Sequence, residues 1–362
     1  MIPVLWSETL KAFWISFAVA ALGSPLVMRL LAAAKSRQTV SQYAPEAHQL
    51  KQGTPTMGGL IILLGFFGWF AWAAIDPLHP KIFLQLRGLL MVTAGFTVIG
   101  FVDDYVVPRW LKGKRGLGWK QKIVAQFAVA AVAVVYGFPG DFGWTQGIGI
   151  FLILFYSNAF NFSDGLDGLA GSIFLALVVG LGGLCFVTPW TWTYLIPLAA
   201  LAGGMIPFLY WNAPPAKVFM GDVGSLPIGA LLGYIVAALA VPSDPVASEA
   251  VLVTGFVGPI GLPDDIFRYV ALFILSGVML IELVPVPLQI LSVKLRKKRL
   301  FLYTPIHHAF EKIGWRETRI VAAFALLQLL LSVASLTVMA QFSNPRPLKH
   351  HYYHYYFSPE ND

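Results

Sequence analysis

Ten long apolar segments divide this chain, and they restrict it to a helical fold that crosses a membrane. About 20 apolar residues in helical form are needed to span a bilayer, so we expect one spanning helix in each segment. The segments are residues 10–33, 57–75, 86–102, 121–138, 146–161, 168–188, 192–211, 225–242, 267–293 and 318–341. Hydrophobic residues make up 57% of the 362 residues and charged residues only 12%, which is unlike a soluble domain. The sequence therefore predicts an all-α polytopic integral membrane protein.

The predicted bundle forms one membrane domain over residues 1–342, followed by a polar, aromatic tail over residues 343–362. We expect this tail to be disordered or interfacial. The alternative is that its histidines bind a metal, and we assign the tail no function. Residues 246–262 are apolar but short and contain glycine and proline, so we expect a surface or re-entrant element there. An eleventh span would invert the end of the topology. The first segment is too long for a signal peptide, and the single Cys185 excludes a disulfide framework.

Lysine and arginine are distributed unevenly over the two sides of the predicted bundle. If the helices alternate in direction, nineteen of these residues fall on one side and six on the other. Because cytoplasmic loops carry the excess of lysine and arginine, we expect both termini outside. The net charge of +7 is then mostly cytoplasmic. Attraction to anionic lipid explains it, and the alternative is that it gathers phosphorylated substrates; without a soluble basic domain, nucleic acid is excluded as a partner.

Ionisable side chains at the ends of the apolar segments are the main functional signal. Such groups are rare near lipid and usually face a polar cavity with a function. The eight residues are Asp103, Asp104, Asp164, Asp167, Asp222, Asp265, His307 and His308. All except Asp265 fall on the cytoplasmic side, which predicts an enzyme with a charged active site at one membrane face. A transporter is the alternative, but the acids are not at mid-membrane and no inverted repeat is visible.

The motif FVDDY places Asp103 and Asp104 at the expected inner end of the third helix. Adjacent carboxylates repel each other, and burying both is costly unless cations or hydrogen bonds compensate. Two solvated charges at a helix end are the simpler interpretation. Acids at a helix C-terminus, however, face the unfavourable end of the helix dipole, which suggests an offsetting role such as binding Mg²⁺ or activating a nucleophile.

The motif NAFNFSDGLDGLAGS spaces Asn158, Asn161, Asp164 and Asp167 three residues apart. Its glycines break the chain before the next apolar segment and permit close backbone approach to a ligand. A simple turn would need one glycine and one aspartate. We therefore expect a polar loop whose amides and carboxylates converge on one ligand.

The motif NAPPAKVFMGDVGSL places Asp222 between two glycines just before the eighth expected helix. A carboxylate on a glycine-rich loop at a helix N-terminus suits a hard divalent cation and its phosphate ligands. Phe219 and Met220 are apolar residues in this polar loop. They either fill the core or, in the case of the aromatic ring, stack on a nucleobase.

The motif TPIHHAFEKIGW carries His307 and His308 in an expected cytoplasmic loop after a basic run. A histidine pair beside basic residues, with Glu311 following, indicates binding of a phosphate or a transition state. Two zinc ligands on one helix face would be spaced by three or four residues, so adjacency argues against zinc.

The motif HQLKQGTPTMGG leads into the second expected helix. Thr54 and Thr56 can cap that helix, and Pro55 suits its first turn. Capping alone could explain the motif, but Lys51 beside it can also contact an anion.

These five motifs, in this order and between these helices, resemble those of the bacterial phospho-N-acetylmuramoyl-pentapeptide transferases, in the polyprenyl-phosphate N-acetylhexosamine-1-phosphate transferase superfamily. The resemblance covers about residues 10 to 341. It implies that phospho-N-acetylmuramoyl-pentapeptide passes from its UDP conjugate to undecaprenyl phosphate, giving lipid I and UMP in peptidoglycan biosynthesis at the bacterial cell membrane. It also implies a Mg²⁺ cofactor, and a homodimer is common in the family. A sibling transferase that uses UDP-N-acetylglucosamine is the alternative.

The resemblance implies a role for each motif residue. Asp222 resembles the Mg²⁺ ligand, with Asp164 as a second metal residue. Asp103 resembles the group that deprotonates or orients the lipid phosphate, with Asp104 as a second acid beside it. The implied substrate contacts are Lys51, Asn212 and Phe219 at the uridine, Asn158, Asn161, Asp164 and Asp167 in the nucleotide loop, His307 and His308 near the diphosphate or sugar, and the basic Lys122.

Three departures from the family pattern bear on the mechanism. Ala309 stands where a third histidine is usual, Val107 stands where a lysine is often found, and residues 243–266 are longer than the usual link. Arg109 or Lys112 is the expected substitute for the missing lysine. We expect direct displacement by the lipid phosphate, and a two-step route through an aspartyl-phosphate remains open.

Overall fold

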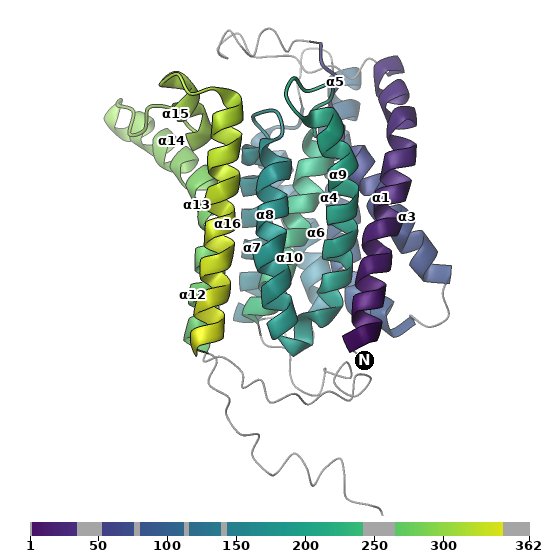
Figure 1. Ribbon diagram of the computed structural model, residues 1–362. Coiled ribbons are helices and arrows are strands. Elements are labelled where there is room, and N and C mark those ends of the chain that lie inside the picture. Colours follow the sequence, from purple (N-terminus) through teal and green to yellow (C-terminus); the bar gives the residue numbers. More distant parts are fainter. Residues whose placement is uncertain are drawn as a thin grey trace, which may run out of the picture.

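The computed structural model describes residues 2–34, 53–75, 80–111, 116–138, 143–241 and 265–342. Helices fill most of these ranges, and no strand occurs in them. The long helices are α1 (Ile2–Ala33), α3 (Gly59–Ile75), α4 (Pro80–Phe101), α6 (Trp119–Gly137), α7 (Trp144–Ser163), α8 (Leu169–Val187), α9 (Leu195–Asn212), α10 (Asp222–Ala240) and α16 (Glu317–Phe342). They run side by side as one bundle (Figure 1). The 3₁₀ turn η2 (Pro189–Tyr194) joins α8 to α9.

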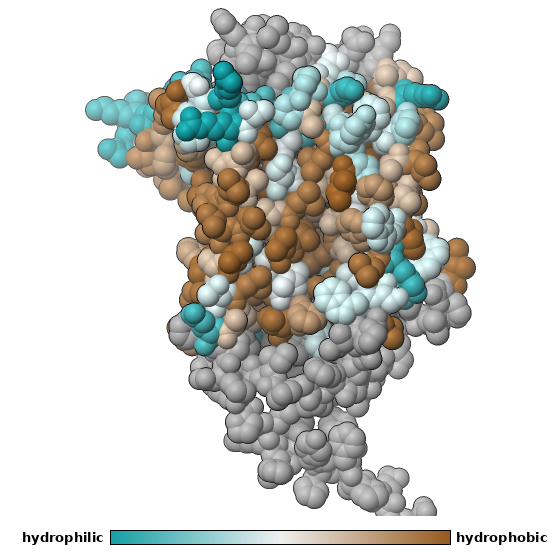
Figure 2. All heavy atoms as spheres, in the orientation of Figure 1, coloured by the Kyte–Doolittle hydropathy of each residue, from teal (hydrophilic) through white to brown (hydrophobic). Residues whose placement is uncertain are grey.

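Seven helices within the described ranges are long and apolar enough to cross a membrane. They are Val4–Ala33, Leu86–Trp110, Leu169–Val187, Thr191–Asn212, Asp222–Ala240, Gly277–Arg296 and Glu317–Gln341. Two shorter helices, Gly59–Ile75 and Ile266–Leu275, are also apolar. On the face shown in Figure 2, apolar side chains form a belt across the middle of the bundle. The chain is therefore a multi-pass membrane protein, as predicted, although the expected number of ten spans is not confirmed.

Helix α10 lies at the centre of the bundle. Its residues from Val223 to Ala240 are all buried, and an all-round apolar helix is expected to be enclosed in this way. Gly229 and Gly233 let it touch the backbone of α7, because a Cβ at either glycine would lie 2.5 Å from a carbonyl oxygen of α7. Small residues four apart commonly permit such close helix contact in membranes. Since α10 begins at Asp222, this packing also fixes a carboxylate at one end of the bundle.

The two ends of the described chain lie at the same end of the bundle. Helix α1 begins, and α16 finishes, opposite to the end that carries α5 (Val107–Trp110), α14 (Pro285–Arg296) and α15 (Ile306–Lys312) (Figure 1). The start of α1 and the end of α16 on one side fit the expected topology, and the assignment of that side to the cell exterior stays a prediction. The expected re-entrant element at 246–262 and the tail from residue 343 lie outside the described residues.

The segment expected to span at 267–293 is not one continuous helix, because the chain breaks it twice. It consists of α12 (Asp265–Leu275), α13 (Gly277–Leu283) and α14 (Pro285–Arg296). The first break falls at Ser276, whose hydroxyl is 2.6 Å from the Tyr156 hydroxyl and donates to the Leu272 carbonyl. The second falls before Pro285, which has no backbone N–H to continue the helix. Helix α14 consequently juts away from the bundle (Figure 1).

We expect Gly233→Ala to destabilise the bundle. The added Cβ would lie 2.5 Å from the Leu152 carbonyl oxygen and 2.8 Å from the Ile153 Cα, so α7 and α10 must separate, at a cost of about 1–3 kcal/mol. Thermal unfolding of the purified protein in detergent measures the change. Gly147→Ala is the matched control, because nothing lies within 4 Å of that Cβ position; equal melting temperatures for both variants would contradict the close contact.

Candidate active site

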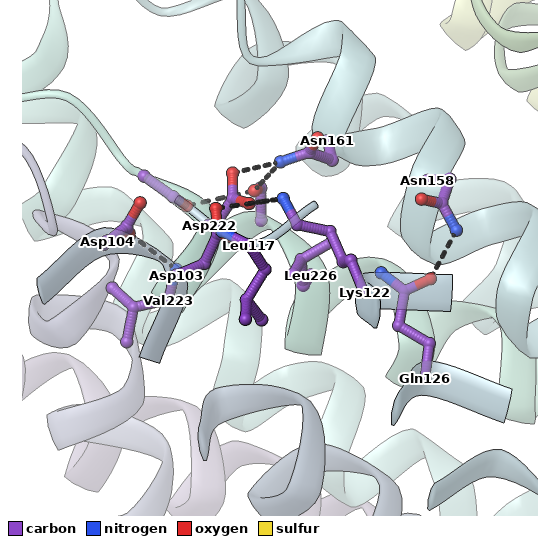
Figure 3. A network of polar contacts seen from close by, with 12 residues as sticks. Asp103, Asp104, Leu117, Lys122, Gln126, Asn158, Asn161, Asp222, Val223 and Leu226 are labelled. Carbon is purple, nitrogen blue, oxygen red and sulfur yellow. Dashed lines mark hydrogen bonds and ion pairs between the residues drawn. The ribbon is translucent and has the colours of Figure 1, made fainter. Parts of the chain in front are cut away.

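The paired aspartates lie within a continuous helix, not at its end. Asp103 and Asp104 belong to the π turn η1 (Val102–Val106), which joins α4 to α5 (Val107–Trp110). The expected helix end at residue 102 is therefore wrong. Single π turns inside α-helices are frequent at functional sites because the extra residue redirects the neighbouring side chains. Here the turn directs both carboxylates toward the start of α10 (Figure 3).

Three carboxylates converge at this point. Asp103, Asp104 and Asp222 each offer an oxygen, and these oxygens lie within 4.8 Å of one another. Lys122, from the first turn of α6, places its Nζ 3.0 Å from Asp103 Oδ2 and also pairs with the Asp222 carboxylate. Asn161, from the last turn of α7, donates to Asp222 Oδ1 at 2.7 Å. We call Asp103, Asp104 and Asp222 the acidic cluster.

Main-chain N–H groups hold the acidic cluster in place. The Leu117 N–H donates to Asp103 Oδ1 at 2.6 Å, and the Val223 N–H donates to Asp104 Oδ2 at 2.9 Å. Val223 lies in the first turn of α10, where the helix dipole favours negative charge. Like charges at this separation repel each other strongly, and Lys122, Asn161 and these N–H groups offset part of that repulsion.

The acidic cluster has the donor chemistry of a site for a hard divalent cation. Carboxylate oxygens are preferred by Mg²⁺, which uses one or two of them together with substrate phosphates. Within the described ranges, Lys122 is the one ammonium that pairs with these three carboxylates, so an excess of negative charge remains when all three are ionised. The cluster therefore fits a divalent cation.

Asp164 lies beside the acidic cluster but outside it. It follows the last residue of α7, and the main chain of Gly221 hydrogen-bonds to its carboxyl group. Burial and then the Asp222 carboxylate raise the pKa of the Asp164 carboxyl well above its usual range. A bound cation would favour the ionised form. Metal binding by Asp164 stays a prediction.

A tight turn between α7 and α8 connects the cluster to the neighbouring loop. Gly168 ends this turn with a φ of 77°, which glycine adopts without strain. Its N–H donates to Asn212 Oδ1 at 2.9 Å, and Asn212 Nδ2 donates to the Val218 carbonyl at 2.8 Å. Asp167 Oδ2 accepts from the Ala216 N–H at 2.9 Å. The buried Asp167 and Asn212 side chains therefore stabilise this turn and the loop before α10. A uridine contact by Asn212 stays a prediction.

Asn158 is separated from the acidic cluster. Its Nδ2 donates to Gln126 Oε1 at 2.9 Å and to the Leu154 carbonyl at 2.8 Å (Figure 3). Gln126 is fully buried on α6 and was missed by the sequence analysis. A polar residue inside the expected span at 121–138 was the signal available. The Asn158 side chain therefore connects α7 to α6. Its contact with the substrate stays a prediction.

The loop before α10 pairs with the segment before α3. The Phe219 N–H donates to the Pro55 carbonyl at 2.9 Å, and the Gly58 N–H donates to the Phe219 carbonyl at 2.7 Å. Helix α3 begins at Gly59, later than expected, and this main-chain pairing explains the motif better than threonine capping. Met220 is buried, whereas the Phe219 side chain is partly exposed. Lys51 lies outside the described residues.

The two histidines lie on a short helix within the connection between the last two candidate spans. Helix α15 (Ile306–Lys312) carries both, with ring centroids 4.1 Å apart. His307 is fully buried and its Nδ1 lies 2.7 Å from Glu282 Oε2. His308 Nδ1 lies 2.5 Å from Glu311 Oε2 on the same helix. Glu282 was missed by the sequence analysis, although an acid inside the apolar segment 267–293 was a visible signal.

The structure shows what replaces the lysine that is often found at the position of Val107. Val107 is buried, with 6% of its surface exposed, so it contributes packing. Arg109 is exposed and its guanidinium lies 5.3 Å from the centre of the Tyr105 ring. Lys112 lies outside the described residues. The basic group that contacts the acidic cluster is thus Lys122.

Fold and site together define a polytopic membrane protein with a cluster of three carboxylates, suited to a metal ion, at one end of its bundle. The family model described as glycosyl transferase family 4 matches residues 86–240, and phospho-N-acetylmuramoyl-pentapeptide-transferase signature 1 matches residues 51–63.

Curated relatives match almost the whole chain. A phospho-N-acetylmuramoyl-pentapeptide-transferase of Shouchella clausii is 35% identical over 90% of this chain and 95% of its own length. One from Geobacillus kaustophilus is 34% identical over 90% and 96%, and one from Acetivibrio thermocellus 34% over 92% and 96%. The chain belongs to the phospho-N-acetylmuramoyl-pentapeptide-transferase family.

We expect the acidic cluster to bind Mn²⁺, used as a paramagnetic probe for Mg²⁺. Asp222→Asn should weaken that binding by more than about tenfold, since even the loss of outer partners of a metal site costs 10–100-fold. Electron paramagnetic resonance of free Mn²⁺ measures the affinity. Glu8→Gln is the control, because Glu8 pairs with Lys11 on α1, far from the cluster. Equal affinity in wild type and Asp222→Asn would place the cation elsewhere.

We expect Asn212→Ala to lower stability as well as activity. The substitution leaves the buried Gly168 N–H and Val218 carbonyl without their partner, which costs about 1–3 kcal/mol. Chemical or thermal unfolding in detergent reports the loss. An unchanged melting temperature together with a raised KM for the nucleotide would assign Asn212 to direct substrate binding alone.

Proposed function

We propose that this protein transfers phospho-N-acetylmuramoyl-pentapeptide from UDP-N-acetylmuramoyl-pentapeptide to undecaprenyl phosphate, giving lipid I and UMP. The observation that supports this most directly is the acidic cluster with Lys122, at the bundle end of a chain related along its length to such transferases. The proposal places the reaction in peptidoglycan biosynthesis, at the cytoplasmic face of the bacterial cell membrane. Phosphoryl transfer depends on positioning and charge neutralisation, which this group of side chains suits.

The acidic cluster and Lys122 act on the reacting phosphates. Asp222, with Asp103 and Asp104 beside it and Asp164 nearby, would hold Mg²⁺, which when bound neutralises charge on the diphosphate and on the leaving UMP. An oxygen of undecaprenyl phosphate attacks the β-phosphorus, and the bond to the oxygen bridging to UMP breaks. Lys122 supplies positive charge to the same phosphates.

Asp103 orients or deprotonates the lipid phosphate. Its Oδ1 accepts from the Leu117 N–H and its Oδ2 pairs with Lys122. Both oxygens therefore already have partners, which favours direct displacement over attack by Asp103 to form an aspartyl-phosphate. A radiolabelled phospho-sugar trapped on the protein without the lipid acceptor would overturn this preference.

The remaining motif residues bind the donor. Phe219 stacks on the uracil ring, supported by its partly exposed side chain, and Lys51 and Asn212 act at the uridine. His307 and His308 act near the diphosphate or sugar, together with the nucleotide loop of Asn161, Asp164 and Asp167 and with Asn158. A homodimer is common among such transferases, and we include it in the proposal without assigning an interface.

We expect the purified protein to release UMP only when UDP-N-acetylmuramoyl-pentapeptide, undecaprenyl phosphate and Mg²⁺ are all present. Asp222→Asn should abolish release, and Phe219→Leu should raise the KM for the donor about tenfold, because base stacking contributes about 1–3 kcal/mol. A coupled UMP assay measures both. Gly147→Ala serves as the control variant.

Two other outcomes of this assay would redirect the proposal. Release from UDP-N-acetylglucosamine, but not from the muramoyl-pentapeptide donor, would move the chain to the sibling specificity. Silence with both donors, in protein shown to be folded, would favour the transport alternative.

A further inference from the structure

His307 is held between two parts of the chain that are distant in sequence. On one side, its Nδ1 lies 2.7 Å from Glu282 Oε2 on α13. On the other, its Nε2 faces the turn between α7 and α8, because a Cβ added to Gly165 would lie 2.3 Å from it. The ring therefore connects α13 to the turn that carries Asp164 and Asp167.

Both oxygens of Glu282 are directed at His307. Oε2 meets the ring nitrogen, and Oε1 lies 3.3 Å from the backbone nitrogen of the same residue, whose N–H donates to it. The side chains of both residues are fully buried. The carboxylate thus fixes the ring and the start of α15 together, and thermal rotation of the imidazole is restricted.

The other ring nitrogen is available for a different contact. Within the described residues, His307 Nε2 is buried and has no hydrogen-bond partner. The oxygens of an ionised carboxylate can only accept a hydrogen bond, so an ionised Glu282 requires the proton on Nδ1. In the neutral ring Nε2 is then an acceptor, and in the charged ring it is a donor.

We propose that Glu282 is a positioning residue for the transfer reaction, which fixes the orientation and tautomer of His307 so that Nε2 faces the Asp164–Gly168 turn. This proposal rests on the proposed function, in which His307 acts near the donor diphosphate. Glu282 touches no reacting group itself. Removal of comparable outer partners lowers the activity of metal enzymes about 10–100-fold.

His308 offers a contrast within the same helix. Its Nδ1 pairs with Glu311 three residues further along α15, and both side chains are partly exposed. That pair joins one turn of one helix. The pair formed by Glu282 and His307 joins two helices to the catalytic end of the bundle, so the two histidines are expected to respond differently to loss of their carboxylates.

A nuclear magnetic resonance experiment tests the tautomer without any substrate. The protein contains seven histidines, and ¹⁵N-labelled imidazole signals of His307 are assigned by their loss in His307→Gln. At alkaline pH we expect wild-type His307 to carry its proton on Nδ1. In Glu282→Gln the amide can either donate or accept, so we expect a mixture of tautomers. An Nε2-protonated ring in the wild type would overturn the proposal, whatever the enzyme's substrate.

A double-mutant cycle tests the functional step. Glu282→Gln should lower kcat about 10–100-fold with less than about a threefold change in the donor KM, and Glu282→Asp should recover part of the loss. In the His307→Gln background the same change should cost less than about threefold, because the residue acts through His307. Glu8→Gln, a carboxylate on α1 paired with Lys11, is the control.

Additive losses in the cycle, or an unchanged kcat in Glu282→Gln, would overturn the positioning role. Each variant's melting temperature is measured alongside. A purely structural contact would lower stability and the amount of active protein, but it would leave the tautomer and the kcat per folded molecule unchanged. If Glu282→Gln does not fold, the wild-type spectrum tests the tautomer and the kcat of Glu282→Asp tests the positioning role. No turnover in the wild type would refute the proposed function and leave the tautomer result intact.

Discussion

Backbone contact around the central helix α10 is the constraint on which the site depends. The helix is enclosed along its length, and glycines allow α7 to approach it at Gly229 and Gly233 and α4 to approach it at Gly100, whose Cβ position lies 2.2 Å from the Asp222 carbonyl oxygen. These contacts leave little freedom along the helix axis. The first residue of α10 is consequently fixed relative to the π turn of α4. Three carboxylates can be held close together only because the main chains that carry them cannot separate.

The site has two halves with different structural origins. The acidic cluster lies on η1 and α10, and it is organised by Lys122 of α6, Asn161 of α7 and main-chain N–H groups. The second half comes from the C-terminal helices, where a buried carboxylate orients a histidine. The turn between α7 and α8 joins them: its Asp167 N–H donates to Glu317 Oε1 at 2.6 Å, and its Gly165 lies against His307.

The apolar segments predicted the helices well, because lipid-facing and core-facing residues are both apolar and helical periodicity is not needed to find them. The motif residues Asp103, Asp104 and Asp222 could be brought together by the expected topology and the resemblance. The π turn could not be predicted, because nothing in FVDDY distinguishes it from a helix end. Glu282 was missed because the candidate ionisable groups were sought at the ends of the apolar segments, whereas Glu282 lies inside one. The breaks at Ser276 and before Pro285 depend on tertiary contacts, such as the hydroxyl pair with Tyr156, that local sequence does not reveal.

Lys122 has a consequence for any measurement on the acidic cluster. Its ammonium sits 3.0 Å from Asp103 and also against Asp222, so it is an internal counter-ion attached by a four-carbon chain. A divalent ion that enters must share these oxygens with the ammonium or displace it. The observed metal affinity then includes the free-energy cost of displacing the ammonium. The intrinsic affinity of the carboxylates for the metal is therefore higher than the affinity that a titration of the whole protein measures. An incoming phosphate can draw the ammonium toward itself, so ion and substrate would bind more tightly together than either does alone.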